Sequence, residues 1–432
     1  MAKPLTSRVL SWSLVLSAGL AAGGASLLAQ SPESDVPEGH PVATTETEHW
    51  VFPEIPDKFL DGLKIDTKFF TLHWGLCVIG DYTAFEQNAA SLEQVGKQED
   101  KKEFRSFRLM LRGQVHFLGA WNYLVTGEYK GFDSDPDLPP WQLTDLWVSR
   151  SLGSFAKLKL GKQKESFVYE MVGDAANLPQ AERFLSPFFT SRDVGVSLSG
   201  TYLGERATWH VGWFNDWWTH GDSFHGSGND FTGRLTFLPI CQDDGTYYVH
   251  LAVSTRYYQG DNDLLRFKGR PQSNVSSNYV DTGDLHADHA WNAGAEALYA
   301  NGPFGLLAEY VRSWVPSDAL GNPTFYGWYT TVSWVFSGAP RPYDRSAGVA
   351  YARRPPVGGH PLGVVELYLR YGRVDLNSHQ VQGGAMNEIY TGINWFATKR
   401  WKLGFGYGNV DLDRFGVRGR TNIFLWRLQW IH

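Results

Sequence analysis

The chain has 432 residues, and no break in its composition separates two globular domains. Its formal net charge of −6 argues against nucleic-acid binding through overall charge, and its two cysteines, Cys77 and Cys241, do not indicate a disulfide framework. Aromatic residues make up 15% of the chain, a content that suits the interface girdles of a membrane protein better than an average globular core.

The first 29 residues have the features of a secretory signal peptide. Lys3 and Arg8 supply the positive end, residues 10–20 supply the apolar core, and Ala25 or Ala29 can precede the cleavage site. A membrane anchor helix is the alternative, although the apolar run is short and rich in Gly and Ala. Residues 30–60 are acidic and contain proline, which predicts a poorly ordered leader on the periplasmic side.

Residues 61–432 are predicted to form an all-β domain. In residues 365–372 and 401–408, aliphatic and aromatic side chains alternate with charged, polar or glycine residues, so the two sets point to opposite faces of a strand. A soluble sandwich shows the same alternation, but strand length and aromatic strand ends favour a transmembrane antiparallel β-barrel. About sixteen strands are predicted, at residues 69–85, 103–117, 121–132, 141–151, 155–168, 192–202, 205–215, 229–239, 246–259, 288–300, 303–315, 323–337, 362–377, 386–397, 400–411 and 420–432.

The connections between these strands support the barrel. Short ones such as 118–120 and 301–302 fall after every second strand, and the alternate connections are mostly longer, at 86–102, 169–191, 216–228 and 260–287. Short turns at one end and long loops at the other are typical of outer-membrane barrels. The proline-rich connection 338–361 breaks this rule, and we expect it to be an ordered, non-strand excursion on the periplasmic side.

Basic residues predominate on the face that is predicted to line the barrel interior. On the second strand, Arg108 and Arg112 share the inward parity, whereas Phe107, Leu109 and Leu111 face outward. The other inward charges include Lys157, Lys159, Arg234, Arg256, Arg370, Lys402 and Arg427, with acidic partners such as Asp145 and Glu366. Such a wall attracts anions in a narrow pore. Alternatively, these charges form ion pairs across the barrel and have no effect on selectivity.

Two loops carry further candidates. The loop 169–191 is long enough to fold into the barrel and narrow it, which would place Arg183 at the constriction; an external loop is the alternative. Arg266, Lys268 and Arg270 recur at every second position, so in an extended segment they project one way, as a charged ladder at the pore mouth would. A solvated basic loop has the same spacing.

Several motifs occur in a fixed order: residues 103–109 (EFRSFRL), Gly161-Lys162 through Glu182-Arg183, residues 192–196 (RDVGV), residues 327–329 (GWY) followed by 341–343 (RPY), and residues 392–396 (GINWF). In this order they resemble the phosphate-selective porin family of bacterial outer membranes, the O and P porins, over nearly all of the chain after residue 60. The resemblance implies a homotrimer of sixteen-stranded barrels, a third loop folded into the pore and a ladder of arginines that guides anions.

The resemblance also implies which residues form the anion pathway. The family's arginine pair on the second strand corresponds to Arg105 and Ser106, so one arginine is lost. The third-loop arginine corresponds to Arg183, the arginine ladder to Arg266, Lys268 and Arg270, and an aspartate of the fourth strand to Asp145. Together with Arg108 and Arg112, which face inward by alternation, they form the candidate set for the pathway: Arg105, Arg108, Arg112, Asp145, Arg183, Arg266, Lys268 and Arg270.

Other positions depart from the family pattern. The two lysines of phosphate-specific members fall at Met171 and Ala176, and an arginine of the first strand falls near Cys77. A phosphate site needs several converging cationic donors, so these losses predict a weaker and broader anion preference, or another solute. The chain also ends on His432, where the family usually has the phenylalanine that the insertion machinery reads.

These features together predict an outer-membrane porin for the passive diffusion of small solutes, leaning toward anions. The expected partners are outer-membrane lipid, small anionic solutes and further copies of the chain. We nominate no catalytic residues, metal site or cofactor, since the close residues His286, Asp288 and His289 fit a solvated cluster. The alternatives are a pore for neutral solutes such as sugars, with Trp217, Trp218 and Tyr258 as stacking platforms, a closed barrel with a surface structural or adhesion role, and a hydrolase barrel for which no Ser–His pair can be nominated.

Overall fold

The computed structural model describes residues 64–116, 119–132, 140–153, 155–215, 228–242, 245–260, 262–336, 340–358 and 362–432. The predicted signal peptide at residues 1–29 and the acidic leader at residues 30–60 lie outside these described residues, as do Trp217 and Trp218. Within the described part of the chain, no helix combines the length and apolarity needed to cross a bilayer.

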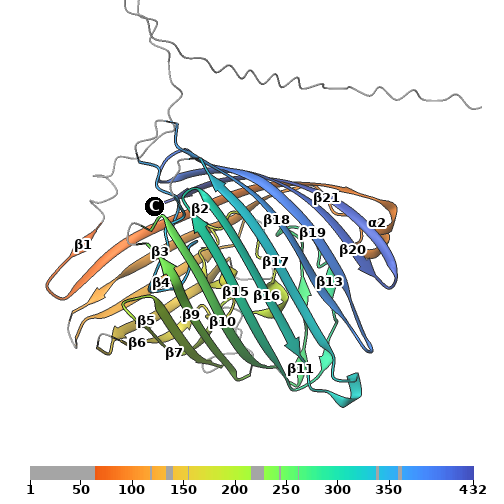
Figure 1. Ribbon diagram of the computed structural model, residues 1–432, viewed down its shortest axis with the longest axis horizontal. Coiled ribbons are helices and arrows are strands. Elements are labelled where there is room, and N and C mark those ends of the chain that lie inside the picture. Colours follow the sequence, from red (N-terminus) through yellow and green to blue (C-terminus); the bar gives the residue numbers. More distant parts are fainter. Residues whose placement is uncertain are drawn as a thin grey trace, which may run out of the picture. The chain divides into compact units, whose positions relative to one another are not determined.

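Sixteen antiparallel strands form a closed barrel (Figure 1). Each strand pairs with the next along the chain, and β2 pairs with β21 from Cys77 opposite Ile431 to Gln87 opposite Thr421, which closes the sheet. The two-residue strand β1 (Ile65–Asp66) adds to the start of β2. The barrel strands are β2 (Phe70–Gln87), β3 (Lys101–Val115), β4 (Trp121–Tyr129), β5 (Trp141–Ser151), β6 (Lys157–Gln163), β7 (Asp193–Tyr202), β8 (Ala207–Phe214), β9 (Asp230–Cys241), β10 (Tyr247–Gln259), β15 (His289–Asn301), β16 (Phe304–Trp314), β17 (Thr324–Val335), β18 (Val364–Ser378), β19 (Val381–Phe396), β20 (Trp401–Arg414) and β21 (Val417–Ile431).

All sixteen predicted strands are therefore confirmed, with boundaries that differ by a few residues. The long connections contain elements that alternation could not predict. The helix α2 (Ala89–Val95) follows β2, and its first turn is capped by the Asn88 side chain, which accepts a hydrogen bond from the Ser91 N–H. The connection after β10 holds two nested antiparallel pairs of short strands: β11 (Leu264–Leu265) with β14 (Leu285–His286) and, between them in the chain, β12 (Lys268–Gly269) with β13 (Val280–Asp281).

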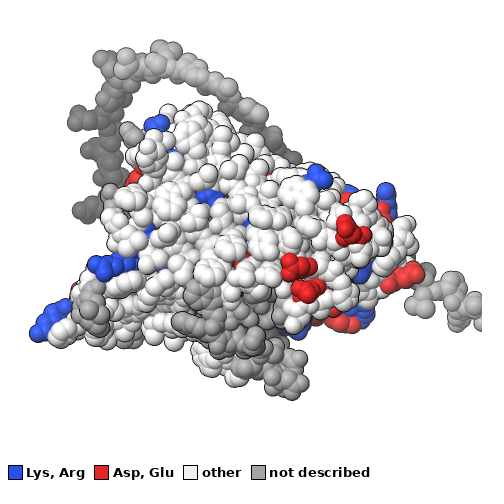
Figure 2. All heavy atoms as spheres, turned by 90° about the horizontal axis from the view of Figure 1, so that it is seen from below, with Lys and Arg blue, Asp and Glu red and all other residues white. Residues whose placement is uncertain are grey.

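The two faces of the barrel differ as the alternation predicts. On β18, Leu367, Leu369 and Tyr371 are 42–53% exposed, while Glu366 and Arg370 between them are buried. Exposed aliphatic and aromatic side chains recur on the same face of the other strands, and the surface in Figure 2 is largely uncharged across its middle. The outer face is thus apolar, as a barrel in lipid requires, and the buried charged side chains lie on the inner face.

The segment 164–192, between β6 and β7, packs against the inner face of the barrel wall. It contains the helix α3 (Tyr169–Val172) and the 3-10 turn η1 (Ser186–Phe188). The Tyr169 N–H donates to Glu309 of β16 at 2.7 Å, and Glu170 pairs with Arg370 of β18 at 2.7 Å. The buried side chains of the segment, including Leu185 and Phe188, join the large apolar cluster formed with β10 and β15–β21.

The segment 340–358, between β17 and β18, also contacts inward-facing side chains. It has no strand, only an isolated bridge between Asp344 and Val349. The predicted ordered, non-strand connection is confirmed for the described residues, but it packs inside the barrel instead of extending away from it. Arg341 donates to Glu366 at 2.8 Å, and the Ala350 N–H donates to the Tyr169 hydroxyl at 2.9 Å. The segment folds inward because its arginine and its apolar residues find their partners there.

The ion pair between Arg234 and Glu296 tests the importance of these inner contacts. Both side chains are almost fully buried, their atoms lie 2.7 Å apart, and Arg234 also donates to the carbonyls of Ala347 and Gly348. Glu296→Gln leaves a buried guanidinium without its carboxylate, so we expect a loss of about 3–5 kcal/mol in unfolding free energy. Denaturant unfolding in detergent, followed by tryptophan fluorescence, measures this loss.

The matched control is Asp284→Asn, which removes the partner of an exposed arginine, Arg266, at 3.5 Å. Exposed pairs contribute little, so we expect a change below about 1 kcal/mol. Equal losses in the two variants would contradict a structural role for the buried pair.

Candidate functional site

A cavity of about 680 Å³ lies between the inner faces of β2–β6 and the segment 164–192. Residues of β21 and Ala352 of the segment 340–358 complete its lining. The buried apolar cluster lies on the other side, where both internal segments pack against β10 and β15–β21. The interior of the barrel is therefore divided into a packed side and an open side.

The open side carries an excess of positive charge. The cavity is lined by eight basic residues, Arg105, Arg108, Lys159, Lys162, Lys164, Arg183, Arg192 and Arg427, and by three acidic residues, Glu128, Asp145 and Asp174. In a confined space, such an excess of fixed positive charge raises the local concentration of anions.

Several of these arginines are held by carboxylates. Arg105 forms two hydrogen bonds with Glu182 of the segment 164–192, at 2.6 and 2.9 Å. Arg427 contacts the same Glu182 at 3.2 Å and also forms two bonds with Asp81. On the neighbouring strands, the pairs are Arg108 with Glu128 and Arg192 with Asp145, each at 3.0 Å. These pairs fix the side chains and offset part of the charge.

Three other cations contact neutral groups. Lys159 lies over the ring of Trp147, 4.7 Å from its centroid, and the Lys164 ammonium donates to the Gly173 carbonyl at 2.9 Å. The Arg183 guanidinium donates to the Glu170 carbonyl at 2.6 Å. Among the described residues, no carboxylate lies within ion-pair distance of these three side chains. In the part of the chain that the structure describes, no paired carboxylate therefore offsets the positive charge of these three side chains.

The structure brings half of the predicted site residues together. Arg105, Arg108, Asp145 and Arg183 line the cavity. Arg105 faces inward because of a bulge: Ile79 lies opposite Ser106 and Gly80 opposite Phe104, so Arg105 is the extra residue. Strict alternation would have placed it on the outer face with Phe107.

The other predicted residues do not line the cavity. Arg112 has the inward parity of β3 but lies beyond the lining and is exposed. Arg266, Lys268 and Arg270 lie in the connection after β10 and are all exposed, in alternation with buried residues, so they share one face as predicted. Arg266 forms hydrogen bonds with Asp281 at 2.7 and 2.8 Å. Burial raises the pKa of Asp281, but the hydrogen bonds from Arg266 and from the Gly283 N–H, together with the positive charge of Arg266, outweigh burial, and the pKa lies below its ordinary value.

Three inward basic residues outside the cavity are paired with carboxylates, whereas the buried Lys402 ammonium donates to the Leu178 carbonyl at 3.1 Å. Arg234, Arg256 and Arg370 are all buried and pair with Glu296, Glu165 and Glu170. For these residues the ion-pair interpretation of the inward charges holds, and they do not line the cavity.

The sequence prediction missed three basic residues of the cavity: Lys162, Lys164 and Arg192. Strict alternation from Lys159 places Lys162 on the outer face, but the structure buries it at the cavity. The turn of the backbone comes from Gly161, whose φ is +116° and whose substitution would bring a Cβ atom within 2.2 Å of the Leu146 carbonyl oxygen. The available signal was the density of lysines between residues 157 and 164.

Apolar residues occupy the positions where the resemblance implies cationic donors. Met171 is fully buried in the large apolar cluster. Cys77 and Ala176 form a small apolar cluster with Ile79, and all three line the cavity.

Comparison with known proteins identifies the family to which this sequence is similar. The model of the family described as phosphate-selective porin O and P matches residues 78–430. An uncharacterized protein of Caulobacter vibrioides is 28% identical over 198 residues, which span 44% of this chain and 38% of that protein's length. The chain therefore matches well under half of that relative.

Solved structures share the fold at low identity. The anion-selective porin from Comamonas acidovorans is 14% identical, with a TM-score of 0.53, and the match covers 84% of this chain and 100% of the porin. The outer membrane channel DcaP of Acinetobacter baumannii is 12% identical, with a TM-score of 0.52, and the match covers 85% and 99% of the two chains. The fold is that of an outer-membrane barrel, and the family match covers most of the sequence: the chain belongs to the phosphate-selective porin O and P family.

Proposed function

We propose that the protein is an outer-membrane porin through which small solutes diffuse passively, with a preference for anions. The observation that carries this proposal is the cavity with eight basic and three acidic lining residues, where Lys159, Lys164 and Arg183 contact neutral groups. Membership of a porin family and a fold shared with an anion-selective porin support it. The apolar outer face supports a position in the outer membrane, which the proposed signal peptide at residues 1–29 would allow the chain to reach.

General anion attraction fits the cavity better than tight phosphate binding. A tight phosphate site needs several donors that are free to converge on one group. Arg105, Arg108 and Arg192 already bind carboxylates, and Met171 and Ala176 offer no cation. Four of the predicted basic residues lie beyond the cavity: Arg112, Arg266, Lys268 and Arg270. We propose that they guide anions as these enter and leave the cavity.

We further propose a homotrimer, surrounded by outer-membrane lipid. The Vibrio cholerae outer membrane protein OmpT shares the fold, at 10% identity and a TM-score of 0.51, and has been solved in a trimer form. Exposed aromatic side chains on the outer face would contact lipid or a second copy.

The lysines that contact neutral groups offer a direct test of selectivity. At about 8 Å in water, one unit charge changes the energy of a monovalent anion by about 0.5 kcal/mol, a factor of roughly two in its local concentration. The same charge disfavours K⁺ equally, so each charge changes the chloride-to-potassium permeability ratio by about fivefold. We expect the double variant Lys159→Gln, Lys164→Gln to lower this ratio about 25-fold, before screening by salt. The zero-current potential in a KCl gradient across a planar bilayer measures the ratio.

The matched control is Lys97→Gln, which removes an exposed lysine paired with Glu99. We expect its permeability ratio to equal that of the natural protein. A ratio unchanged in the double variant as well would contradict a permeation path along this cavity.

Removal of the negative charge of Glu182 should change the selectivity in the opposite direction. Glu182 binds both Arg105 and Arg427, so Glu182→Gln removes negative charge from beside the cavity. We expect a higher chloride-to-potassium ratio, by about fivefold for this one charge at about 8 Å, before screening by salt. Asp413→Asn, at an exposed pair with Arg418, should leave the ratio unchanged, and far-UV circular dichroism should confirm that both variants are folded.

The natural protein in the same bilayer distinguishes the alternatives. Anion preference without block by millimolar phosphate supports a general anion filter. Cation preference, or no preference together with block by sugars, would favour the pore for neutral solutes. Absence of conductance would favour a closed barrel with a structural role.

A further inference from the structure

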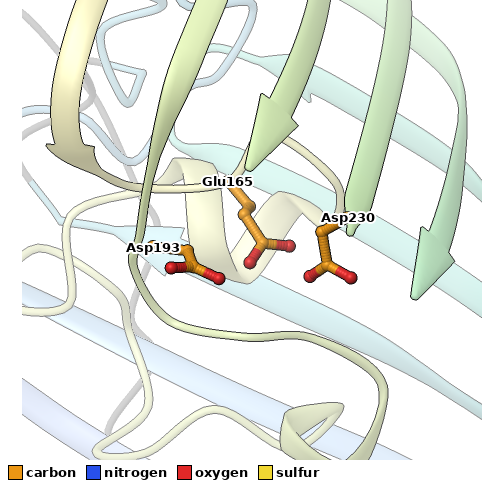
Figure 3. A group of neighbouring side chains, drawn as sticks. All are labelled: Glu165, Asp193 and Asp230. Atoms are coloured by element: carbon orange, nitrogen blue, oxygen red, sulfur yellow. The ribbon is translucent and has the colours of Figure 1, made fainter. Parts of the chain in front are cut away.

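Three buried carboxylates lie together outside the cavity: Glu165, Asp193 and Asp230 (Figure 3). All three residues are at most 1% exposed, and one oxygen from each lies within 4.8 Å of the others. The Glu165 carboxylate lies between those of Asp193 and Asp230 (Figure 3). This spacing allows one ion to contact all three groups.

The cluster joins three parts of the chain at one place in the wall. Glu165 follows the end of β6 by two residues, Asp193 is the first residue of β7, and Asp230 is the first residue of β9. Glu165 is thus the second residue of the segment 164–192, which lines the cavity, and Asp193 directly follows that segment. Asp230 belongs to β9, which is separated from β7 by β8. An ion bound here would hold both ends of that segment to the wall.

Basic side chains act on the cluster. Arg256 donates to Glu165 at 2.7 Å and also to Asp230, with its guanidinium 4.4 Å from the centre of the Tyr258 ring. Lys162 interacts electrostatically with Asp193.

One oxygen of the cluster also lacks a donor. Glu165 is fully buried, and its Oε1 atom has no hydrogen-bond partner among the described residues. Burial of a carboxylate oxygen without a compensating group is unfavourable in free energy. A further positive group at this point would remove that penalty.

We propose that Glu165, Asp193 and Asp230 bind a hard divalent cation of the calcium class. The donors are all carboxylate oxygens, which suit Ca²⁺ or Mg²⁺ rather than transition metals. Three carboxylates can supply up to six oxygens when each binds through both, and Ca²⁺ accepts such irregular, flexible geometry, whereas Mg²⁺ requires near-ideal octahedral geometry. Ca²⁺ is therefore favoured over Mg²⁺, and it ties both ends of the segment 164–192 to β9.

The first experiment measures binding to the full-length mature chain. The protein is refolded in detergent without outer-membrane lipids, which themselves bind divalent cations, and then dialysed against EDTA. Equilibrium dialysis against CaCl₂ should give one saturable Ca²⁺ per chain, with weaker binding of Mg²⁺ and a higher thermal midpoint in Ca²⁺, because the ion binds the folded state. Absence of saturable binding at millimolar Ca²⁺ would overturn the proposal and leave a proton as the compensating group.

The second experiment places the ion. Glu165→Gln combined with Asp193→Asn should weaken binding more than about tenfold, because carboxylate number sets calcium affinity. The control is Asp411→Asn combined with Asp413→Asn, two exposed acidic residues on β20, which should bind as the natural protein does. Equal binding by the cluster variant would place the ion elsewhere and overturn the proposal.

A third measurement applies if the cluster variant does not fold. Crystals of the natural protein grown with Tb³⁺ in place of Ca²⁺ give an anomalous signal that locates the ion directly. We expect the peak between the three carboxylates. A peak only at other positions would overturn the proposal. None of these readouts depends on conductance, so they stand or fall separately from the proposed porin function.

Discussion

Burial of polar side chains inside a closed sheet is the constraint on which this structure depends. Period-two alternation sends every second side chain inward, and in this chain many of those are charged. A buried charge without a partner is far more costly than an exposed one. The segments 164–192 and 340–358 supply many of those partners: Glu170 for Arg370, and Arg341 for Glu366.

The way in which these partners are supplied makes the barrel interior asymmetric. Both segments pack on β10 and β15–β21, where they meet each other through Tyr169 and Ala350. The inner faces of β2–β6 are left to line the cavity. The basic residues of the packed side are used in packing, and those of the open side remain available to solutes. Basic residues on the inner wall therefore have two different roles. Their position relative to the two internal segments determines whether they are used in packing or line the cavity.

Alternation in the sequence was sufficient to predict the strands, because every strand of a sheet with one apolar and one polar face shows apolar and polar residues in turn. The site required more. The inward direction of Arg105 depends on a one-residue bulge, and that of Lys162 on the positive φ of Gly161; neither is visible in a binary pattern. Whether an inward charge is neutralised depends on which internal segment packs against it. Arg105, for example, is paired because the segment 164–192 places Glu182 beside it. The cluster of Glu165, Asp193 and Asp230 joins three strand ends that are far apart in sequence, and the pairing of β6 with β7, β7 with β8 and β8 with β9 brings them together.

The central claim is that solutes pass along β2–β6 and not along the packed side. Substituted-cysteine labelling tests it most directly, in a background of Cys77→Ser and Cys241→Ser. Gln142→Cys places a thiol at the cavity lining, and Thr331→Cys places one on the inner face of β17, where the residue is 2% exposed. A negatively charged methanethiosulfonate reagent should reduce the chloride current of the Gln142→Cys channel and leave that of Thr331→Cys unchanged. An equal reduction in both, or a reduction only in Thr331→Cys, would contradict the account.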